Sequence, residues 1–360
     1  MKNYQAMLEL AGRVTEKEAL EGKSAALSGI GLIHSEKGDP DRALKYHKDA
    51  LKIHREIGYK QGQACDLGNM GLIYSDKGDL DRALKYARDS LNIARDIGYK
   101  QGEANSLCNI GVIFSDKGDL NQALKYYKDA LKIDREIGYK RGEASDLGNV
   151  ALVHKAKGDL DQALKHLKRV LKIHREIRYK RDEASDLTNM GLIHATKGDF
   201  DLALKHHKDA LKIEREIGYK QGEANVLGNI GLIYSDKGDL DQALKYYEDA
   251  LKIHRAIGYK QGEASGLGNI GVIHRAKGDL DQALKYLEDA VKIHIEIGHK
   301  QGQAADLNNV GAVYKDMGNL DKAVQYCNDA LKIFEEMGMR VQVAIAKRNI
   351  DKVSQQIKQK

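Results

Sequence analysis

The feature that most constrains the fold of this chain is a repeat of forty residues. The ten residues from Gly71 to Leu80 return unchanged from Gly231 to Leu240, and close variants begin at Gly31, Gly111, Gly191, Gly271 and Gly311. A strict period of this length is typical of a solenoid, in which each unit is too small to bury its own apolar face and stacks on its neighbours. We therefore expect one repeat domain with an open surface, and we expect the function to lie on that surface.

Composition places the chain among soluble, helix-rich proteins. It has one proline and no tryptophan, hydrophobic residues make up 42% of it, and no apolar run reaches membrane-spanning length. The N-terminus shows no signal-peptide pattern. The three cysteines, Cys65, Cys108 and Cys327, are too widely spaced for a metal knuckle or a disulfide framework. We therefore expect free thiols and a cytoplasmic location.

The formal charge of +6 arises from 59 basic and 53 acidic residues that are interleaved along every repeat. This pattern is typical of a solvated helical surface. Lysines recur at both turns between helices, but no platform of surface aromatics accompanies them, so we expect no nucleic-acid partner. The two columns are Lys60, Lys100, Lys140, Lys180, Lys220, Lys260 and Lys300, and Lys77, Lys117, Lys157, Lys197, Lys237 and Lys277.

Each unit reads as two helices joined by short turns. In residues 60–98, Ala64 and Leu67 begin an apolar pattern of helical spacing that stops at Gly78. This glycine suits the left-handed position after a helix, and Asp79 suits the N-cap of the next one. The second helix ends at Gly98. We call the first helix of a unit helix A and the second helix B.

The repeat predicts an all-α fold of antiparallel helix pairs. We expect an N-terminal partial-repeat helix in residues 1–21, eight forty-residue units in residues 22–341, and a C-terminal capping helix in residues 342–360. The last helix reads as a cap because polar residues replace apolar or small ones, at Lys347, Arg348, Asp351, Gln355 and Gln356.

The spacing of small and aromatic residues within a unit resembles the tetratricopeptide repeat. The positions that carry the resemblance are Leu67, Gly71, Tyr74, Gly78, Ala83, Tyr127 and Ala130. The unit is six residues longer than the common form, which resembles the repeats of Pins-type adaptors and of bacterial and archaeal sensor arms. The resemblance implies a right-handed superhelix whose A helices line a concave groove, and a binder of extended peptides instead of an enzyme.

One polar residue of helix A recurs in every unit except the first. It forms a column of asparagines at Asn69, Asn109, Asn149, Asn189, Asn229, Asn269 and Asn309, which Asn349 continues. The resemblance implies that these side chains project into the groove and hydrogen-bond the backbone of a bound peptide. An amide suits that role because it is both donor and acceptor. In the alternative interpretation, the asparagines are structural and bond the adjacent helix or water.

Other residues flank this column on helix A. Small residues that would let a ligand backbone approach stand at Gly68, Cys108, Gly148, Thr188, Gly228 and Gly268, and aliphatic residues stand at Leu72, Val112, Leu152, Leu192, Leu232 and Val272. Aspartates precede the column at Asp66, Asp146, Asp186 and Asp306 and follow it at Asp76, Asp116, Asp236 and Asp316. They would either rim the groove and favour a basic ligand, or lie on a solvated helix edge.

Motifs for catalysis, metals and cofactors are not convincing. The sequence from Gly266 to Gly271 has the glycine spacing of a dinucleotide-binding loop, but no strand precedes it. The thirteen histidines follow the repeat spacing and form no short chelating motif; His34, His154, His194 and His274 share a column with aromatic residues. We therefore expect no enzyme activity, no metal and no cofactor.

The fourth unit is the least regular. It carries a basic stretch, and Arg178 replaces the glycine that ends the other B helices. We expect Arg178 to keep the left-handed conformation at a cost of about 1 kcal/mol relative to glycine. The stretch is either drift in one copy or a docking patch for an acidic partner. Its residues are Lys168, Arg169, Lys172, Arg175, Arg178 and Arg181.

These features lead to one principal hypothesis and two alternatives. The principal one is a cytoplasmic interaction scaffold that binds an extended peptide through the asparagine column. The first alternative is a structural solenoid that assembles head to tail because its copies are so alike, with Met7, Leu8 and Leu10 at the exposed end. The second is a sensor arm of a larger regulatory protein, suggested by a first helix that looks like a helix B without its partner.

Overall fold

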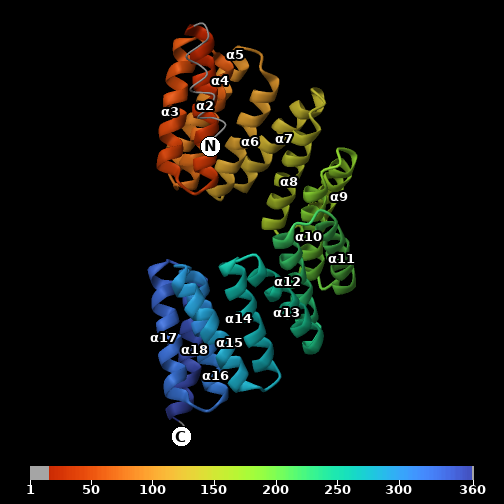
Figure 1. Ribbon diagram of the computed structural model, residues 1–360, viewed down its shortest axis with the longest axis vertical. Coiled ribbons are helices and arrows are strands. Elements are labelled where there is room, and N and C mark those ends of the chain that lie inside the picture. Colours follow the sequence, from red (N-terminus) through yellow and green to blue (C-terminus); the bar gives the residue numbers. More distant parts are fainter. Residues whose placement is uncertain (1–15, 359–360) are drawn as a thin grey trace. The chain divides into compact units, whose positions relative to one another are not determined.

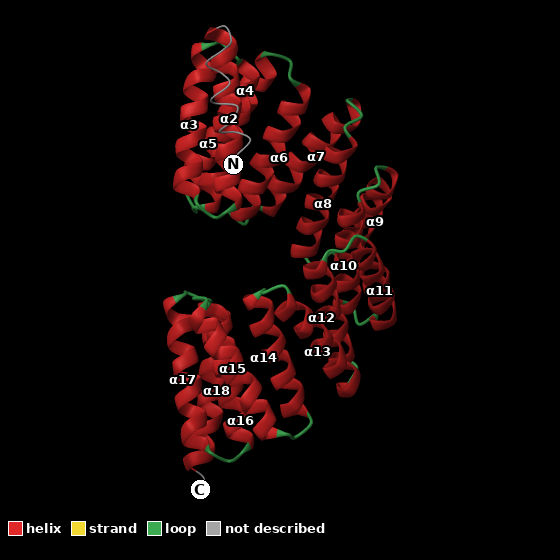
Figure 2. Ribbon diagram, viewed as in Figure 1, coloured by secondary structure: helices red, strands yellow, loops and turns green. Residues whose placement is uncertain are grey.

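The computed structural model describes residues 16–358, which form seventeen helices and no strand (Figure 2). In chain order they are α2 (Glu16–Glu36), α3 (Pro40–Glu56), α4 (Lys60–Asp76), α5 (Leu80–Asp96), α6 (Lys100–Asp116), α7 (Leu120–Glu136), α8 (Lys140–Ala156), α9 (Leu160–Glu176), α10 (Lys180–Thr196), α11 (Phe200–Glu216), α12 (Lys220–Asp236), α13 (Leu240–Ala256), α14 (Lys260–Ala276), α15 (Leu280–Glu296), α16 (Lys300–Asp316), α17 (Leu320–Glu336) and α18 (Arg340–Lys358) (Figure 1).

The helices alternate as the repeat predicts. Even-numbered helices from α2 to α16 are A helices, odd-numbered ones are B helices, and α18 takes the A position after the eighth pair. Each A helix packs on its own B helix, and within each compact unit a B helix also packs on the following A helix. The prediction of an all-α solenoid is confirmed.

The chain divides into two compact units, residues 1–179 and residues 180–360. Helices α2 to α9 belong to the first unit and α10 to α18 to the second. The turn before the boundary, at residues 177–179, has the same three-residue length as the other turns. One continuous domain with a right-handed superhelical twist stays a prediction.

Three-residue turns of one design connect the helices. At the end of α4, Gly78 has φ 77°, the Gly78 N–H donates to Ser75 O at 2.8 Å, and the Asp79 N–H donates to Tyr74 O at 2.9 Å. The Asp79 side chain then accepts from the Arg82 N–H at 3.1 Å and caps α5. These bonds satisfy backbone groups that a helix end leaves without a partner.

Arg178 is the only residue other than glycine with positive φ among those that the structure describes. Its φ is 58°, its N–H donates to Arg175 O at 3.2 Å, and the Tyr179 N–H donates to His174 O at 2.9 Å. The prediction that Arg178 keeps the left-handed conformation is confirmed.

The expected boundary near residue 21 is not a helix end. Helix α2 runs from Glu16 to Glu36 without a break. Glu18 stands where later units have a glycine of positive φ, such as Gly58, so the usual stop is missing and the helix continues. The rest of the predicted N-terminal helix, including Met7, Leu8 and Leu10, lies outside the described residues.

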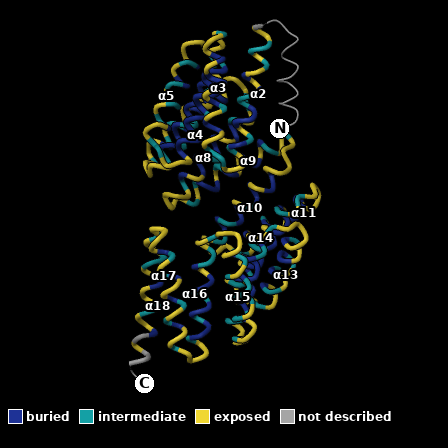
Figure 3. The backbone as a smooth tube through the Cα atoms, turned by 60° about the vertical axis from the view of Figure 1, so that its left-hand side comes forward, coloured by how far each residue is buried: buried dark blue, intermediate teal, exposed yellow. Residues whose placement is uncertain are grey.

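Close approach of A and B helices explains one column of glycines. A side chain added to Gly71 would place its Cβ 3.2 Å from Ala83 O, and at Gly111 it would lie 2.6 Å from the Tyr127 ring. Buried residues recur along the helices of both compact units, as the colouring of the backbone shows (Figure 3). Small residues on helix A therefore permit the pairing that the sequence predicts.

Candidate functional site

The asparagine column lies on A helices, and its side chains are half-buried except for the exposed Asn189 and Asn269. Several amides reach the preceding A helix: the Asn109 Nδ2–H donates to Gly68 O at 3.5 Å, and the Asn149 Nδ2–H contacts Cys108 Sγ at 3.3 Å. In the cap, the Asn349 Nδ2–H donates to Asn308 Oδ1 at 3.3 Å. Each contact uses one N–H of an amide that has further donor and acceptor positions.

The aliphatic residues beside the column form an exposed stripe in parts of both compact units. Leu152 is 58% exposed, Leu232 is 48% exposed and Val272 is 38% exposed, whereas Leu72, Val112 and Leu192 are half-buried. In the first compact unit the structure thus places Asn69, Asn109, Asn149, Leu72, Val112 and Leu152 on α4, α6 and α8. In the second it places Asn189, Asn229, Asn269, Asn309, Leu192, Leu232 and Val272 on α10, α12, α14 and α16.

The small residues next to the column are not equally accessible. A Cβ at Gly148 or Gly228 would meet nothing within 4 Å, so a ligand has room to approach there. At Gly268 a Cβ would lie 2.7 Å from Asp306 Oδ1, so the next helix already occupies that space.

Two hollows in the second compact unit are lined by asparagines of the column. The larger, of about 350 Å³, lies among α12, α13 and α14 and includes Asn229, Leu232 and Asn269 in its lining. The smaller, of about 200 Å³, is lined by Asn309 and Asn349 among others. Consecutive members of the column are thus brought together twice.

Both interpretations of the aspartates before the column are wrong, because these carboxylates are buried. Asp66 is fully buried, Asp146 is 2% exposed, and Asp186 and Asp306 are each 6% exposed. For Asp66, Asp146 and Asp306 the reason is visible within one compact unit: they lie where an A helix packs on the preceding B helix. We call each such contact a joint.

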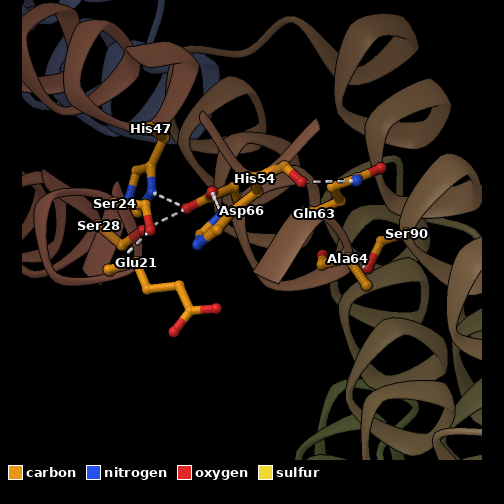
Figure 4. A network of polar contacts seen from close by, with 9 residues as sticks. All are labelled: Glu21, Ser24, Ser28, His47, His54, Gln63, Ala64, Asp66 and Ser90. Atoms are coloured by element: carbon orange, nitrogen blue, oxygen red, sulfur yellow. Dashed lines mark hydrogen bonds and ion pairs between the residues drawn. The ribbon is translucent and has the colours of Figure 1, made fainter. Parts of the chain in front are cut away.

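The first joint is a hydrogen-bonding network in which both carboxylate oxygens of Asp66 have partners (Figure 4). Asp66 Oδ1 accepts from Ser28 Oγ at 2.7 Å and from His47 Nδ1 at 3.1 Å, and Asp66 Oδ2 accepts from His54 Nδ1 at 2.7 Å. Burial alone would raise the pKa of Asp66, but the hydrogen bonds from His47, His54 and Ser28 hold this pKa below its usual value.

Other joints hold carboxylates with fewer partners. Burial and the nearby charge of Glu143 raise the pKa of Asp134 to about 6. Burial raises the pKa of Asp146 to about 7, with a further contribution from Asp134. Burial also raises the pKa of Asp306 to about 7; its Oδ2 lies 3.4 Å from His294 Nε2. In each of these three carboxylates one buried oxygen has no hydrogen bond, which is unfavourable.

The lysine columns are paired locally. Lys100 and Arg95 both donate to the Glu103 carboxylate at 2.9 Å, and this triad recurs around Glu143, Glu223 and Glu263. At the other turn, Lys117 Nζ donates to Asp81 Oδ1 at 3.0 Å. Pairing with carboxylates reduces the net positive potential that nucleic-acid binding requires.

The basic stretch of the fourth repeat lies mostly on one helix. Lys168, Arg169, Lys172 and Arg175 are exposed on α9, and Arg178 is exposed in the turn that follows. Arg169 joins Lys128, Lys132 and Arg135 around a hollow of about 470 Å³ in the first compact unit. Arg181 belongs to the second compact unit, where its guanidinium lies 4.3 Å from the centre of the Tyr219 ring. A docking role for these residues stays a prediction.

The histidines of the aromatic column stack as the sequence predicts. His34 stacks on Tyr46, His154 on His166 and His274 on Tyr286, with ring centroids 5.3 to 5.5 Å apart. Across residues 16–358 no group of three or more His, Cys, Asp or Glu side chains is arranged to hold a metal ion. No helix in that range is long and apolar enough to span a membrane.

Sequence reasoning missed the joints. Helix B contributes His54, Asp134, His254 or His294, and the next helix A contributes the residue twelve positions later. The second position carries aspartate, serine, valine or glycine in different units. This variation was the available sequence signal for a buried contact, because a solvent-exposed position has no reason to carry Val226.

The comparisons with known proteins agree with this fold. The tetratricopeptide repeat model matches residues 22–96, 62–136, 102–176, 143–216, 182–256 and 262–336. No curated protein sequence matches the chain significantly.

Solved structures with low sequence identity share the fold. The apo form of the quorum sensor NprR from B. thuringiensis is 15% identical with a TM-score of 0.66, over 92% of this chain and 92% of that one. A STAND protein with a tetratricopeptide repeat sensor from Pyrococcus horikoshii is 17% identical with a TM-score of 0.65, over 93% of this chain and 55% of that one. BtubC from P. vanneervenii is 21% identical with a TM-score of 0.55, over 61% of this chain and 92% of that one.

The family model matches most of the chain, and the structure supplies the helix pairs, the close glycine contacts and the turns that such repeats require. This chain belongs to the tetratricopeptide repeat family.

Proposed function

We propose that this protein is an interaction scaffold or sensor that binds an extended peptide segment along its A helices. The asparagine column would bond the peptide backbone, and the aliphatic stripe beside it would contact apolar side chains. We further propose that the protein acts in the cytoplasm and is not an enzyme.

One observation carries the proposal: amides and exposed aliphatic side chains share the A helices and line a hollow. Asn229, Asn269 and Leu232 belong to the hollow of about 350 Å³, and Leu232 is 48% exposed. An apolar surface beside groups that both donate and accept hydrogen bonds suits a peptide, whose backbone needs both kinds of partner.

A similar structure supports ligand binding by this architecture. It is a Rap protein in complex with competence and sporulation factor, 15% identical with a TM-score of 0.52, over 94% of this chain and 99% of that one. A sensor is the second candidate function, because NprR is a quorum sensor and the Pyrococcus horikoshii protein has a tetratricopeptide repeat sensor.

The structural interpretation of the asparagines makes a different prediction. Asn109 and Asn149 contact the preceding A helix, so their loss would reduce stability whether or not a peptide binds. Asn229 and Asn269 line the larger hollow, so their loss is the better test of binding.

The experiment is a selection from a library of random linear peptides, followed by fluorescence polarisation with the selected peptides. Each amide hydrogen bond contributes about 1 kcal/mol, so N229A/N269A should weaken binding about thirtyfold. The matched control is N92A/N328A, which removes two exposed asparagines from B helices and should leave binding unchanged. Equal affinity of both variants, folded by circular dichroism, would refute the role of the column.

A further inference from the structure

The larger hollow stands where the first joint has its buried carboxylate. The four residues of the first network, Ser28, His47, His54 and Asp66, correspond at a spacing of two hundred residues to Gly228, Tyr247, His254 and Gly266. All four of these later residues line the hollow. This joint therefore has a histidine at the position of His54 but a glycine at the position of Asp66.

The buried histidine of this joint has one ring nitrogen without a hydrogen bond. His254 is 6% exposed, and its Nδ1 has no hydrogen-bonding partner among the described residues. In the first joint the equivalent His54 Nδ1–H donates to Asp66 at 2.7 Å. Burial of a polar ring nitrogen without a hydrogen bond is unfavourable. Donation from His254 to an acceptor that enters the hollow would therefore be favourable.

The rest of the lining suits a carboxylate acceptor. Asn229, Asn269, Gln261 and Ser265 offer donors near the opening, and no Asp, Glu, Lys or Arg belongs to the lining. Tyr247 is 4% exposed, and burial with the nearby charge of Asp236 raises its pKa to about 12, so its hydroxyl keeps its proton and can donate.

The first joint shows that a hydroxyl and imidazoles can hold a buried anion. Asp66 is fully buried, and its partners are one hydroxyl and two imidazoles, with no Lys or Arg among them. Its pKa nevertheless lies below the usual value, because these hydrogen bonds favour the charged form.

We propose that the hollow among α12, α13 and α14 is a specificity pocket for an acidic side chain of the bound peptide. The ligand's Asp or Glu carboxylate takes the place that Asp66 holds in the first joint and accepts from His254 and Tyr247. This inference rests on the proposed peptide-binding function for the source of the carboxylate. The presence of the hollow does not depend on the proposed peptide-binding function.

A substitution at Gly266 would fill the pocket with a side chain of the protein itself. A Cβ at Gly266 would meet only Leu251, at an ordinary contact distance of 3.6 Å. G266D therefore introduces an aspartate at the position that corresponds to Asp66, with room for its Cβ, and G266A is the matched control that adds a methyl group and no carboxylate.

The experiment follows the imidazole resonances of His254 by NMR during pH titrations of the full chain. The probe is N-acetyl-glutamate α-amide, whose only carboxylate is on the side chain; N-acetyl-glutamine amide is its neutral isostere. The probe should raise the titration midpoint of His254 by about one unit in the native chain and in G266A, since a nearby carboxylate favours the imidazolium. In G266D the midpoint should already be high and should not respond.

Any of three results would refute the proposed pocket. They are a titration midpoint of His254 that the probe leaves unchanged, a midpoint that shifts equally with the neutral isostere, or a midpoint that shifts as much in folded G266D as in the native chain. A larger response to N-acetylglycine, which carries only an α-carboxylate, would assign the pocket to a peptide C-terminus and refute the side-chain proposal. If peptides bind through Asn229 and Asn269 without preference for acidic residues, the pocket fails and the proposed function stands.

Discussion

Replacing Arg178 with glycine should stabilise the protein, because Arg178 ends α9 with φ 58°. The left-handed conformation costs a residue with a Cβ roughly 1–2 kcal/mol. Glycine is more flexible in the unfolded chain, which offsets about 0.4–1 kcal/mol of the gain. We therefore expect the free energy of unfolding to rise by about 1 kcal/mol in R178G.

The expected shift in melting temperature depends on how much of the chain unfolds together. The entropy of unfolding is about 2.1 cal/mol/K per residue. If the first compact unit, residues 1–179, unfolds alone, a gain of 1 kcal/mol corresponds to about 2–3 °C. If all 360 residues unfold together, it corresponds to about 1 °C. Calorimetry gives the midpoint, and urea denaturation gives the free energy.

A substitution at the equivalent position of the next repeat tests the same backbone effect in the opposite direction. Gly218 ends α11 with φ 71°, and a Cβ there would meet nothing within 4 Å. G218R should therefore lose about 1 kcal/mol through the backbone alone, and R178G/G218R should return close to the stability of the native chain. A melting temperature of R178G that is unchanged or lower, while G218R loses stability, would refute the reasoning for Arg178.

Three further substitutions test the helix contacts. D66A removes the shared acceptor of the first joint and leaves His54 buried without its partner, so urea denaturation at pH 7 should show a loss of about 3 kcal/mol. G71A forces a Cβ to 3.2 Å from Ala83 O, which should lower stability by about 1–3 kcal/mol and lower the melting temperature. D146N should stabilise the chain at pH 8 by about 2 kcal/mol or more and have little effect at pH 4, as measured by denaturation at both pH values.

The sign of the last prediction follows from proton linkage. Asp146 has a folded-state pKa of about 7, above the ordinary value of 3.8, so between these values the folded chain binds the extra proton. Stability therefore falls as pH rises from about 4 to about 7 and then stays low, and D146N removes this loss. A benefit of D146N confined to pH 4 would contradict this account, and a native stability for D66A or G71A would contradict the packing of those contacts.

The helices and turns could be predicted from the sequence because their signals are local. Gly78 and Asp79 mark a helix end and the next helix start by their own backbone and hydrogen-bonding preferences, and the structure confirms both. The expected boundary near residue 21 was wrong because it followed from the repeat length, although Glu18 in place of the usual glycine is itself a local signal that the helix continues.

Helical spacing alone does not reveal the joints, because it does not show how many neighbours a helix has, and the signal that remains is the presence of residues such as Val226 in the same column. Asp66 and Asn69 are three residues apart and share one side of α4, so a surface position for one suggested a surface position for the other. Helix α4 packs against α2, α3, α5 and α6, and Ser28 of α2 with His47 and His54 of α3 covers the side that carries Asp66. Placement of Asn229 and Asn269 around a hollow likewise depends on an absent side chain at Gly228.

The joints also bear on how a gene for such an array can change length. Recombination between similar repeats adds or removes forty codons and leaves every turn intact, yet it matches a new pair of residues at one joint. Loss of residues 100–139 would remove Asp134 and set Asp146 opposite Ala94, whereas loss of residues 140–179 would set Asp134 opposite Asp186. Selection on array length should therefore favour the first deletion over the second, although both proteins would have the same number of repeats.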